Sequence, residues 1–193
     1  MAMKFTQIPA DTFQKLQLNA GIMVDTFEPS TGVFGNLMGA TTGGIQFTSN
    51  PSYEDFGEDV DNCPPNTKEL KRLTSYDPQM SGTFLTCTAD IIKGLTGAAD
   101  IASGDTTHVV PRAELLSTDF EDLWWIGDYS DINTGTTAGF LAIHLMNALN
   151  QNGFQITSGK NAKGQMRFEY HAHYSISTQD VVPFEIYCKA GTT

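Results

Sequence analysis

The sequence predicts a mainly β fold, a β-sandwich or barrel with one or two short flanking helices and long loops. Composition is the first reason, because only 17% of the 193 residues are charged and 18 are glycine, which suits strands and turns better than long surface helices. The second is the alternation of apolar and polar residues, clearest in "QMRFEYHAHYSI" (165–176). The third is the number of such elements, since about seven or eight short strands can be counted between turn signals.

The N-terminal region predicts one helix before the first strands. A short helix is expected within residues 9–21, because Asp11 and Gln14 have the spacing of a capping box and Gly21 can end the helix. The elements expected after it are a strand (21–27), a glycine-rich loop (28–44) and a strand (45–49).

The middle of the chain predicts a hairpin and a helix. The turn pair Asp77 and Pro78 lies between "KELKRLTSY" and "QMSGTFLTCT", which indicates two strands joined by a tight turn. A short helix is expected over residues 89–98, where Ile91, Ile92 and Leu95 fall on one side, and a loop follows it.

The C-terminal half predicts strands. Residues 119–131 are typical of a strand with acidic flanks, and its adjacent Trp124 and Trp125 would point to opposite faces, one into the core and one available as an interface anchor. Residues 139–148 are ambiguous, because their composition favours a helix while their alternation favours a strand. Residues 182–189 predict the last strand.

The net charge of −11 is concentrated in two stretches, residues 54–61 and 94–131. Within the first, "YEDFGEDVDN" holds five carboxylates and no base. A chain with this excess of acidic over basic residues lacks the basic patch by which proteins bind nucleic acid. The acids are therefore expected to hold a metal, to run acid–base chemistry or to present a negative surface.

Metal chemistry has two candidate starting points. The acidic stretch fails as an EF-hand, because Gly57 stands where a ligand belongs, although Asp59, Asp61 and Asn62 leave a looser calcium site open. The second is an HxH pair on one strand face, which would need a third ligand to bind zinc or iron. The residues of this second set are His171 and His173, with Glu169, His108 or His144 as the third ligand.

Other signatures are missing or incomplete. "GATTGGI" has the glycine spacing of a phosphate loop, but Ile45 stands where lysine is required. Cys63, Cys87 and Cys188 form no CxxC pair, which favours free thiols in a reducing compartment. No secretory signal or apolar run of membrane-spanning length is present, so we expect synthesis and folding in the cytoplasm without membrane insertion. We expect no catalytic residue and no cofactor.

A succession of segments resembles the major tail (tail tube) proteins of long, non-contractile-tailed bacteriophages and prophages of Gram-positive hosts. The segments keep the same order and cover nearly the whole chain. They are "QLNAGIMVDTFEP", "GATTGGIQFTSNPSYEDFGEDVDNCPPNTKELKRL", "SGTFLTCT", "ADIIKGLTGAAD", "VVPRAEL", "DFEDLWWIGDYSD", "AIHLMNALNQNGF" and "KGQMRFEYHAHYS" followed by "QDVVPFEIYCKAG".

The resemblance implies a structural protein rather than an enzyme. Its fold would be a tail-tube-type β-sandwich or barrel, a single domain over residues 1–193 without a separate C-terminal immunoglobulin-like domain. Subunits would form hexameric rings that stack into the tail tube of the virion around a tape measure protein, between tail terminator and distal tail proteins. Double-stranded DNA would later pass through without sequence-specific binding. In this setting residues 139–148 and 153–158 are expected to be strands.

The acidic residues then gain two possible roles, lining the lumen so that DNA slides without sticking, or pairing with bases of the next ring. The long loops over residues 32–44 and 50–71 are expected to order on assembly. The candidate acids are Glu54, Asp55, Glu58, Asp59, Asp61, Asp119, Glu121, Asp122, Asp128 and Asp131, and the candidate basic partners are Lys68, Lys71 and Arg72.

Three alternatives remain open on the sequence. One is a tube, terminator or distal subunit of a related injection system, which would share the fold. Another is a cupin-like metal enzyme that uses His171 and His173. The third is a carbohydrate-binding β-sandwich that stacks sugars on Trp124, Trp125 and Tyr129.

Overall fold

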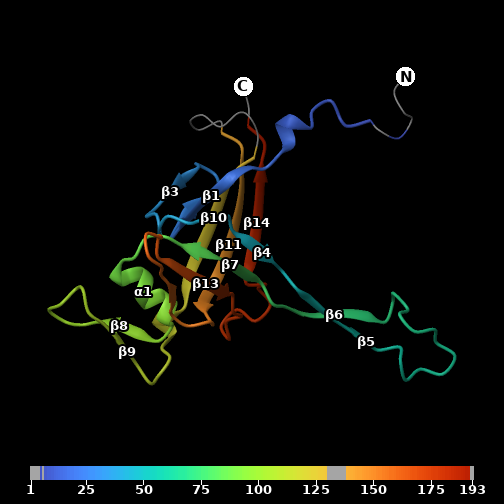
Figure 1. Ribbon diagram of the computed structural model, residues 1–193. Helices are drawn as coiled ribbons and strands as arrows, with labels where there is room; N and C mark the ends of the chain where they lie inside the picture. The colour runs from blue at the N-terminus through green and yellow to red at the C-terminus, as the bar shows by residue number, and fades with distance from the viewer. Residues whose placement is uncertain (1–4, 6, 130–137, 192–193) are drawn as a thin grey trace.

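A curled antiparallel sheet forms the body of the protein, and the computed structural model describes residues 5, 7–129 and 138–191 (Figure 1). The mainly β prediction is confirmed, and α1 is the single α-helix among these residues. The strands are β1 (Leu18–Val24), β2 (Phe27–Glu28), β3 (Val33–Phe34), β4 (Gln46–Thr48), β5 (Pro51–Asp55), β6 (Lys71–Tyr76), β7 (Gln79–Phe84), β8 (Ala99–Ile101), β9 (Val109–Pro111), β10 (Glu121–Asp128), β11 (Phe140–Asn150), β12 (Gln155–Thr157), β13 (Gln165–His171) and β14 (Phe184–Lys189). The helical segments are the 3₁₀ turns η1 (Phe13–Lys15) and η2 (Ser117–Asp119) and the α-helix α1 (Ala89–Thr96).

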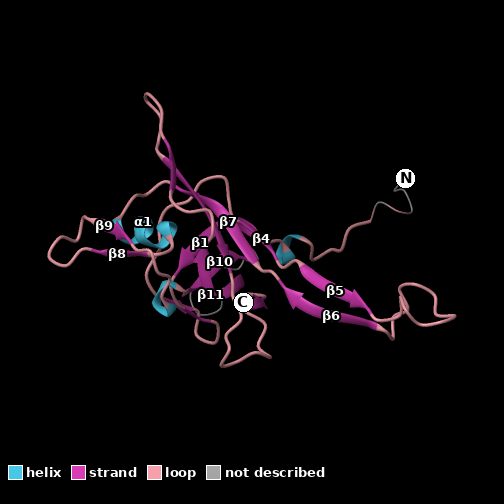
Figure 2. Ribbon diagram, turned by 90° about the horizontal axis from the view of Figure 1, so that it is seen from below, coloured by secondary structure: helices cyan, strands magenta, loops and turns pink. Residues whose placement is uncertain are grey.

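The main sheet has eight strands. Six follow one another in the order β1-β10-β11-β13-β7-β4, with β14 paired to β11 and β12 paired to β13. Three two-stranded ribbons, β2–β3, β5–β6 and β8–β9, lie outside this sheet. Figures 1 and 2 show β5–β6 projecting from the body on one side and β8–β9 projecting on the opposite side.

β11 joins the two halves of the sheet. Its first part pairs with β10 on one side and with β14 on the other, whereas its last two residues, Leu149 and Asn150, pair with β13. Leu145 and Ala148 of β11 pair with Leu123 and Glu121 of β10. Two residues of β11 lie between the first two, but one residue of β10 lies between their partners, so β11 has a bulge here. Asn147 lies in this bulge with φ 49°, a left-handed conformation that asparagine tolerates better than most residues. Because a bulge bends its strand, it turns β11 from one half toward the other.

The hydrophobic core fills the inside of the curl. Alternate residues of β13 and β7, together with the inner face of α1, supply half of its side chains, and β10 and β11 supply most of the rest. A smaller cluster on the other face of β10 and β11 consists of Val24, Phe27, Trp124, Phe140 and Ala142. The main cluster comprises Met23, Met80, Phe84, Ile91, Leu95, Leu123, Trp125, Ile143, Leu145, Ala148, Met166, Phe168, Tyr170 and Ala172.

Gly82 marks a place in this core where no side chain fits. A Cβ atom added there would lie 2.7 Å from Phe168 Cζ and 2.8 Å from Ile45 Cδ1. We therefore expect Gly82→Ala to lower the free energy of unfolding by about 1–3 kcal/mol through overpacking. Gly159→Ala is the matched control, because its Cβ would meet only an ordinary contact at 3.6 Å. Equal denaturant midpoints for the two variants would contradict this description of the core.

The predicted N-terminal helix is wrong. Residues 13–15 form a single 3₁₀ turn without a side-chain cap, and β1 begins at Leu18. Asn19 and Gly21 have φ of 64° and 73°, which a right-handed helix does not allow. Pairing of β1 with β10 therefore overrides the local capping signal.

The predicted hairpin around Asp77 and Pro78 is also wrong. Both flanking strands exist, but β6 pairs with β5 while β7 pairs with β13 and β4. The two residues instead form the link by which the chain returns from the β5–β6 ribbon to the body. The Asp77 N–H donates to the Asn50 carbonyl (3.1 Å), which closes the base of that ribbon.

The remaining predictions fit the structure more closely. α1 matches the predicted helix, capped by the Thr88 hydroxyl and ended by Gly97 at φ 85°. β10, β11, β12 and β14 fall within or close to the predicted strands, and the ambiguous residues 139–148 are a strand. β13 stops at His171, so Tyr174 and Ile176 are exposed rather than buried with its apolar face. The strands that were missed are β3 in the predicted glycine-rich loop, β5 in the acidic stretch, and β8 and β9 in the region after α1.

Candidate functional site

The most prominent surface feature is the β5–β6 ribbon with its connecting loop, residues 51–76, here called the arm (Figures 1 and 2). Tyr53 and Leu73 are direct cross-strand partners and are 58% and 46% exposed. Phe56 and Val60 in the connecting loop are 56% and 49% exposed. Four large apolar side chains thus lie on a projection that contributes nothing to the core, the arrangement expected of a surface that another chain covers.

The tip of the arm is organised by its own hydrogen bonds. Asp55 accepts hydrogen bonds from the N–H groups of Gly57 (2.9 Å) and Asn66 (2.7 Å). These two donors, helped by the charge of Lys71, hold the pKa of Asp55 below its ordinary value. Asp55 is therefore a turn-forming residue as well as a surface acid.

The arm also brings together the predicted acids and bases. Glu54 lies opposite Arg72 in the strand register, and Asp55 lies opposite Lys71. Lys68 lies 3.5 Å from Glu69 at the exposed tip. The bases that we expected to pair with a neighbouring ring thus have acids beside them in their own chain. The tip acids without a described ion-pair partner are Glu58, Asp59 and Asp61.

The second acidic stretch does not form one surface. Asp119 is buried and forms an ion pair with Arg112. Asp122 accepts a hydrogen bond from the Asn147 N–H (2.9 Å), and Asp128 accepts one from Asn19 Nδ2 (2.8 Å). Glu121 is exposed at the mouth of a cavity, and Asp131 lies outside the described residues. These carboxylates mostly stabilise local structure, so we leave them out of the assembly surface.

The base of the arm is fixed to the body by polar and aromatic contacts. The Tyr76 N–H donates to the Tyr174 hydroxyl (3.0 Å), and the Tyr76 ring packs against Phe184 at 5.4 Å between centroids. Asp77 Oδ1 lies 3.1 Å from His171 Nδ1. This contact with His171 is the main reason that the pKa of Asp77 is below its ordinary value. The arm therefore leaves the body in a defined direction.

The two histidines of the HxH pair have separate partners. His171 Nε2 lies 3.3 Å from Glu169, and its other nitrogen faces Asp77. His173 Nδ1 lies 3.0 Å from the Asn147 carbonyl oxygen. Among the described residues no group of three or more His, Cys, Asp or Glu side chains is arranged to hold a metal ion, and this includes the acids at the tip of the arm.

The tryptophans point to opposite faces, as predicted, but both are buried. Trp125 lies in the main core and donates from Nε1 to the Ala20 carbonyl (3.0 Å). Trp124 is covered by His144, stacked at 4.0 Å between centroids, and by the edge of Phe27. The expectation of an exposed tryptophan anchor or sugar-stacking platform is wrong, because other side chains already cover these ring faces.

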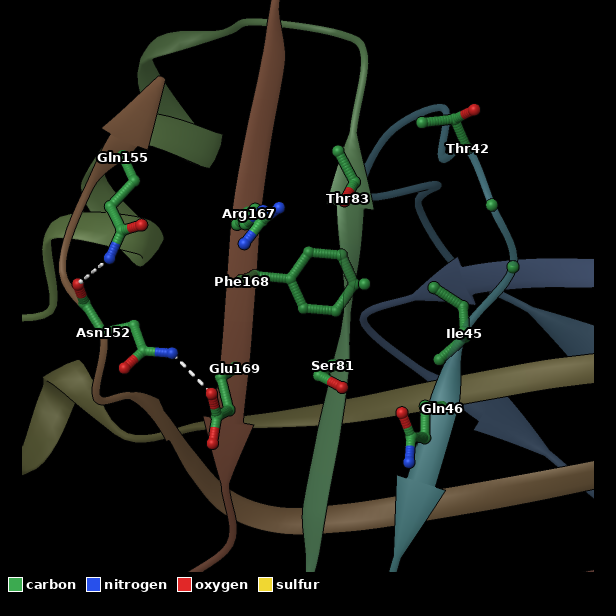
Figure 3. A pocket seen from close by; sticks show the side chains of 13 residues that line it. Thr42, Ile45, Gln46, Ser81, Thr83, Asn152, Gln155, Arg167, Phe168 and Glu169 are labelled. Atoms are coloured by element: carbon green, nitrogen blue, oxygen red, sulfur yellow. Dashed lines mark hydrogen bonds between the residues drawn. The ribbon is translucent and has the colours of Figure 1, made fainter. Parts of the chain in front are cut away.

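A polar cavity of about 500 Å³ lies over β12, β13, β7 and β4 (Figure 3). Figure 3 shows the Phe168 ring extending from β13 toward β7, with Arg167 and Glu169 on either side of it along the strand. Glu169 accepts a hydrogen bond from Asn152. The charges of Arg167 and Glu169 cancel each other, so the lining of this cavity offers polar contacts without a net charge.

Four described strands of the main sheet pair with one neighbour only, and they are β1, β4, β12 and β14. The two longest of them, β1 and β14, offer the most extensive edges for pairing. Among the described strands, β14 pairs only with β11, and Ile186 at its centre is 53% exposed. β1 pairs with β10 through a bulged register. Among the described residues, the backbone contact on the outer side of β1 is near its end, where the Met38 N–H donates to the Met23 carbonyl (3.0 Å). Unpaired edges of this kind accept strands from other chains.

No family model and no curated protein matches this sequence. No helix in the described part of the chain is long and apolar enough to cross a membrane.

Sequence reasoning missed the apolar side of the arm. It treated residues 50–71 as a loop, although "PSYED" and "KRLTSY" hold the strand-forming pair Tyr53 and Leu73 on opposite sides of the acidic segment. The aromatic and β-prone content of these two segments was the available signal.

Proposed function

We propose that this chain is a tail tube protein, a virion structural subunit that forms hexameric rings stacked into the tube of a long non-contractile phage tail. Such a tube would enclose the tape measure protein and later conduct double-stranded DNA. Tail terminator and distal tail proteins would close its two ends, and assembly would take place in the cytoplasm of the host bacterium. The resemblance of the sequence segments supports this proposal, and the arm is the single observation that carries it.

The arm supports self-assembly because it combines exposure with order. Its apolar side chains are exposed, yet its tip and base are held by specific hydrogen bonds. A pre-ordered projection loses little conformational entropy when it binds. An arm of this kind would bury Tyr53, Phe56 and Leu73 against the adjacent subunit.

Sheet edges supply the second contact. β1 and β14 are the two end strands of the order β1-β10-β11-β14. In a head-to-tail ring the β14 edge of one subunit would lie beside the β1 edge of the next, and closing the ring would leave no free edge there. Six chains would carry six times the net charge of −11, which repels a DNA duplex from the wall of the channel.

The position of the acids on the arm favours contact between rings over a role in the lumen. Glu58, Asp59 and Asp61 lie in the loop that joins β5 to β6. Figure 1 shows this loop at the far end of the projecting ribbon, away from β1 and β14, whose edges would close one ring. In this role the three acids would meet basic side chains of the adjacent ring. Lys160 and Lys163, exposed in the β12–β13 loop and without an ion pair in the described part of the chain, are candidates.

Reversal of the tip charges tests this role. We expect the triple variant Glu58→Lys, Asp59→Lys, Asp61→Lys to form rings that no longer stack, because like charges then face each other between rings. Electron microscopy of the assembled material gives the readout, with Glu114→Lys and Asp180→Lys as controls on other exposed loops. Normal tubes with altered DNA ejection would instead assign the acids to the lumen, and normal tubes with normal ejection would exclude both roles.

The length of the assembled object separates a tube subunit from a terminator. A terminator stops at one ring, whereas a tube subunit polymerises.

A further inference from the structure

A cavity of about 430 Å³ lies between α1, the segment after β3 and the ends of β7 and β13. Its apolar wall is formed by Leu37, Met38, Phe84 and Ile91. The volume falls in the range of small-ligand pockets. The cavity lies apart from the arm and from the free edge of β14.

The hydroxyl of a buried tyrosine opens onto this cavity. Tyr170 is 4% exposed and lines the cavity together with Gly94. A Cβ atom added to Gly94 would lie 3.3 Å from the Tyr170 hydroxyl oxygen, so the hydroxyl lies beside the glycine. It makes no hydrogen bond to any residue that the structure describes. The hydroxyl is not one of the enclosed polar atoms that lack a partner in the described part of the chain, so it is open to the cavity and can meet a ligand there.

The state of this hydroxyl is set by its surroundings. Burial, and secondarily the charge of Glu121, raise the pKa of Tyr170 far above its ordinary value. The side chain is therefore neutral at physiological pH, and its oxygen can accept a hydrogen bond from a cation.

Three carboxylates surround the same cavity, and no Lys, Arg or His lines it. Asp25 is held in place by Asn36, whose backbone and side-chain N–H groups both donate to it at 2.8 Å. Asp90 and Glu121 have no ion-pair partner in the described part of the chain. The cavity thus combines an apolar wall with a negative rim.

We propose that this cavity binds an alkylammonium or alkylguanidinium group. The apolar stem of the ligand contacts Leu37 and Ile91, as the stems of lysine and arginine pack on apolar surfaces. Its N–H groups donate to the Tyr170 hydroxyl and to the carboxylates of Glu121 and Asp90. This chemistry belongs to a basic side chain of a second copy or to a free amine, and it does not depend on the proposed tube function.

Titration with n-butylammonium and n-butylguanidinium tests the site, with 1-butanol as the uncharged probe. We expect saturable binding of both cations by calorimetry and at least roughly tenfold weaker binding of 1-butanol. Tyr170→Phe and Glu121→Gln should each weaken the binding of both cations by about tenfold. The control variant Asp180→Asn, which changes an exposed acid elsewhere on the surface, should leave the affinity unchanged. Equal affinity for 1-butanol, or unchanged affinity in both cavity variants, would overturn the proposal.

A measurement on the unmodified protein removes any dependence on how the variants fold. Amide chemical shifts in α1 and around Tyr170 should move with n-butylammonium and saturate at one equivalent. Shifts spread over the surface without saturation would count against the site.

Sedimentation velocity then separates the two sources of the cation. If the source is a basic side chain of a second copy, saturating n-butylammonium lowers self-association, and a photo-crosslinker placed at Asp90 captures a lysine or arginine peptide of this chain. If the source is a free amine, self-association is unchanged and the protein purified in amine-free buffer carries an amine of defined mass in native mass spectrometry. Either result requires the binding described above.

Discussion

The double variant Tyr53→Ser, Leu73→Ser is expected to remain folded and to lose assembly. The two side chains are cross-strand neighbours on the arm and are exposed in the isolated chain. Covering them in a tube would contribute about 2 kcal/mol or more from buried apolar area. Their loss should therefore raise the protein concentration required for assembly by roughly thirtyfold. Electron microscopy across a concentration series provides the measurement.

Controls separate this effect from damage to the fold. Tyr53→Phe with Leu73→Ile keeps the arm apolar and should assemble normally. Val110→Ser changes a side chain that is 40% exposed on the opposite ribbon and should have no effect on assembly. Because the arm lies outside both core clusters, the thermal midpoint of the double variant should stay close to that of the parent protein. Assembly at the parental concentration would contradict the role of the arm.

The variant Asp119→Ala is expected to cost about 3–5 kcal/mol of folding stability. The Asp119 side chain is only 1% exposed, pairs with Arg112 and accepts a hydrogen bond from the Leu116 N–H (2.8 Å). Removing the carboxylate leaves a largely buried guanidinium without one of its partners. Chemical denaturation measures the loss, which is a large share of the about 5–15 kcal/mol typical of a domain.

The other carboxylate at this arginine provides a matched control. Asp100 lies 2.7 Å from Arg112 Nε but its side chain is 57% exposed. Asp100→Ala should cost no more than about 1 kcal/mol, because exposed ion pairs contribute little. Equal losses for the two alanine variants would contradict the distinction between the buried and the exposed partner.

Acidic pH should lower the folding stability through protonation of Asp119. Burial by itself favours the neutral acid, but the Leu116 N–H and the Arg112 guanidinium outweigh it and hold the pKa of Asp119 below its ordinary value of 3.8. A lowered pKa in the folded state contributes stability above the unfolded-state value. That stability is lost as the pH falls below about 4 and through the folded-state value. Asp119→Asn should therefore show a shallower loss of stability with acid than the parent protein.

Sequence patterns correctly predicted elements that bury a single face or that end at a residue with a characteristic backbone conformation. The alternation in β13 identified Met166, Phe168 and Tyr170 as buried, and Gly97 correctly indicated the end of α1. Both signals depend on the immediate sequence, through the period of a strand and the φ that glycine tolerates.

Long-range pairing explains the failures. A strand signal does not name its partner, so β6 and β7 were joined to each other although each pairs with a more distant strand. The capping signal at Asp11 was outweighed by the pairing of β1 with β10, about 100 residues away. The acids of residues 119–128 illustrate the same limit, because only the fold shows that Asp119 has Arg112 as a partner while Glu121 faces a cavity.

The candidate surfaces were predictable only in part. The acidic tip was visible in the sequence as an uninterrupted run of carboxylates, whereas the apolar pair behind it depends on the register of β5 and β6. The Tyr170 side chain could be predicted as buried, but its hydroxyl could not be predicted to face a cavity, because α1 and the segment after β3 enclose that space from elsewhere in the chain.

Negative-stain electron microscopy of the purified protein, over a concentration series at moderate salt, tests the central proposal most directly. A tube subunit should give rings, and at higher concentration stacked tubes, with a central channel wide enough for a DNA duplex (about 20 Å across) and six-fold symmetry in end views. A chain that remains monomeric at the highest concentration reached, or that forms particles without a channel, would contradict the assignment.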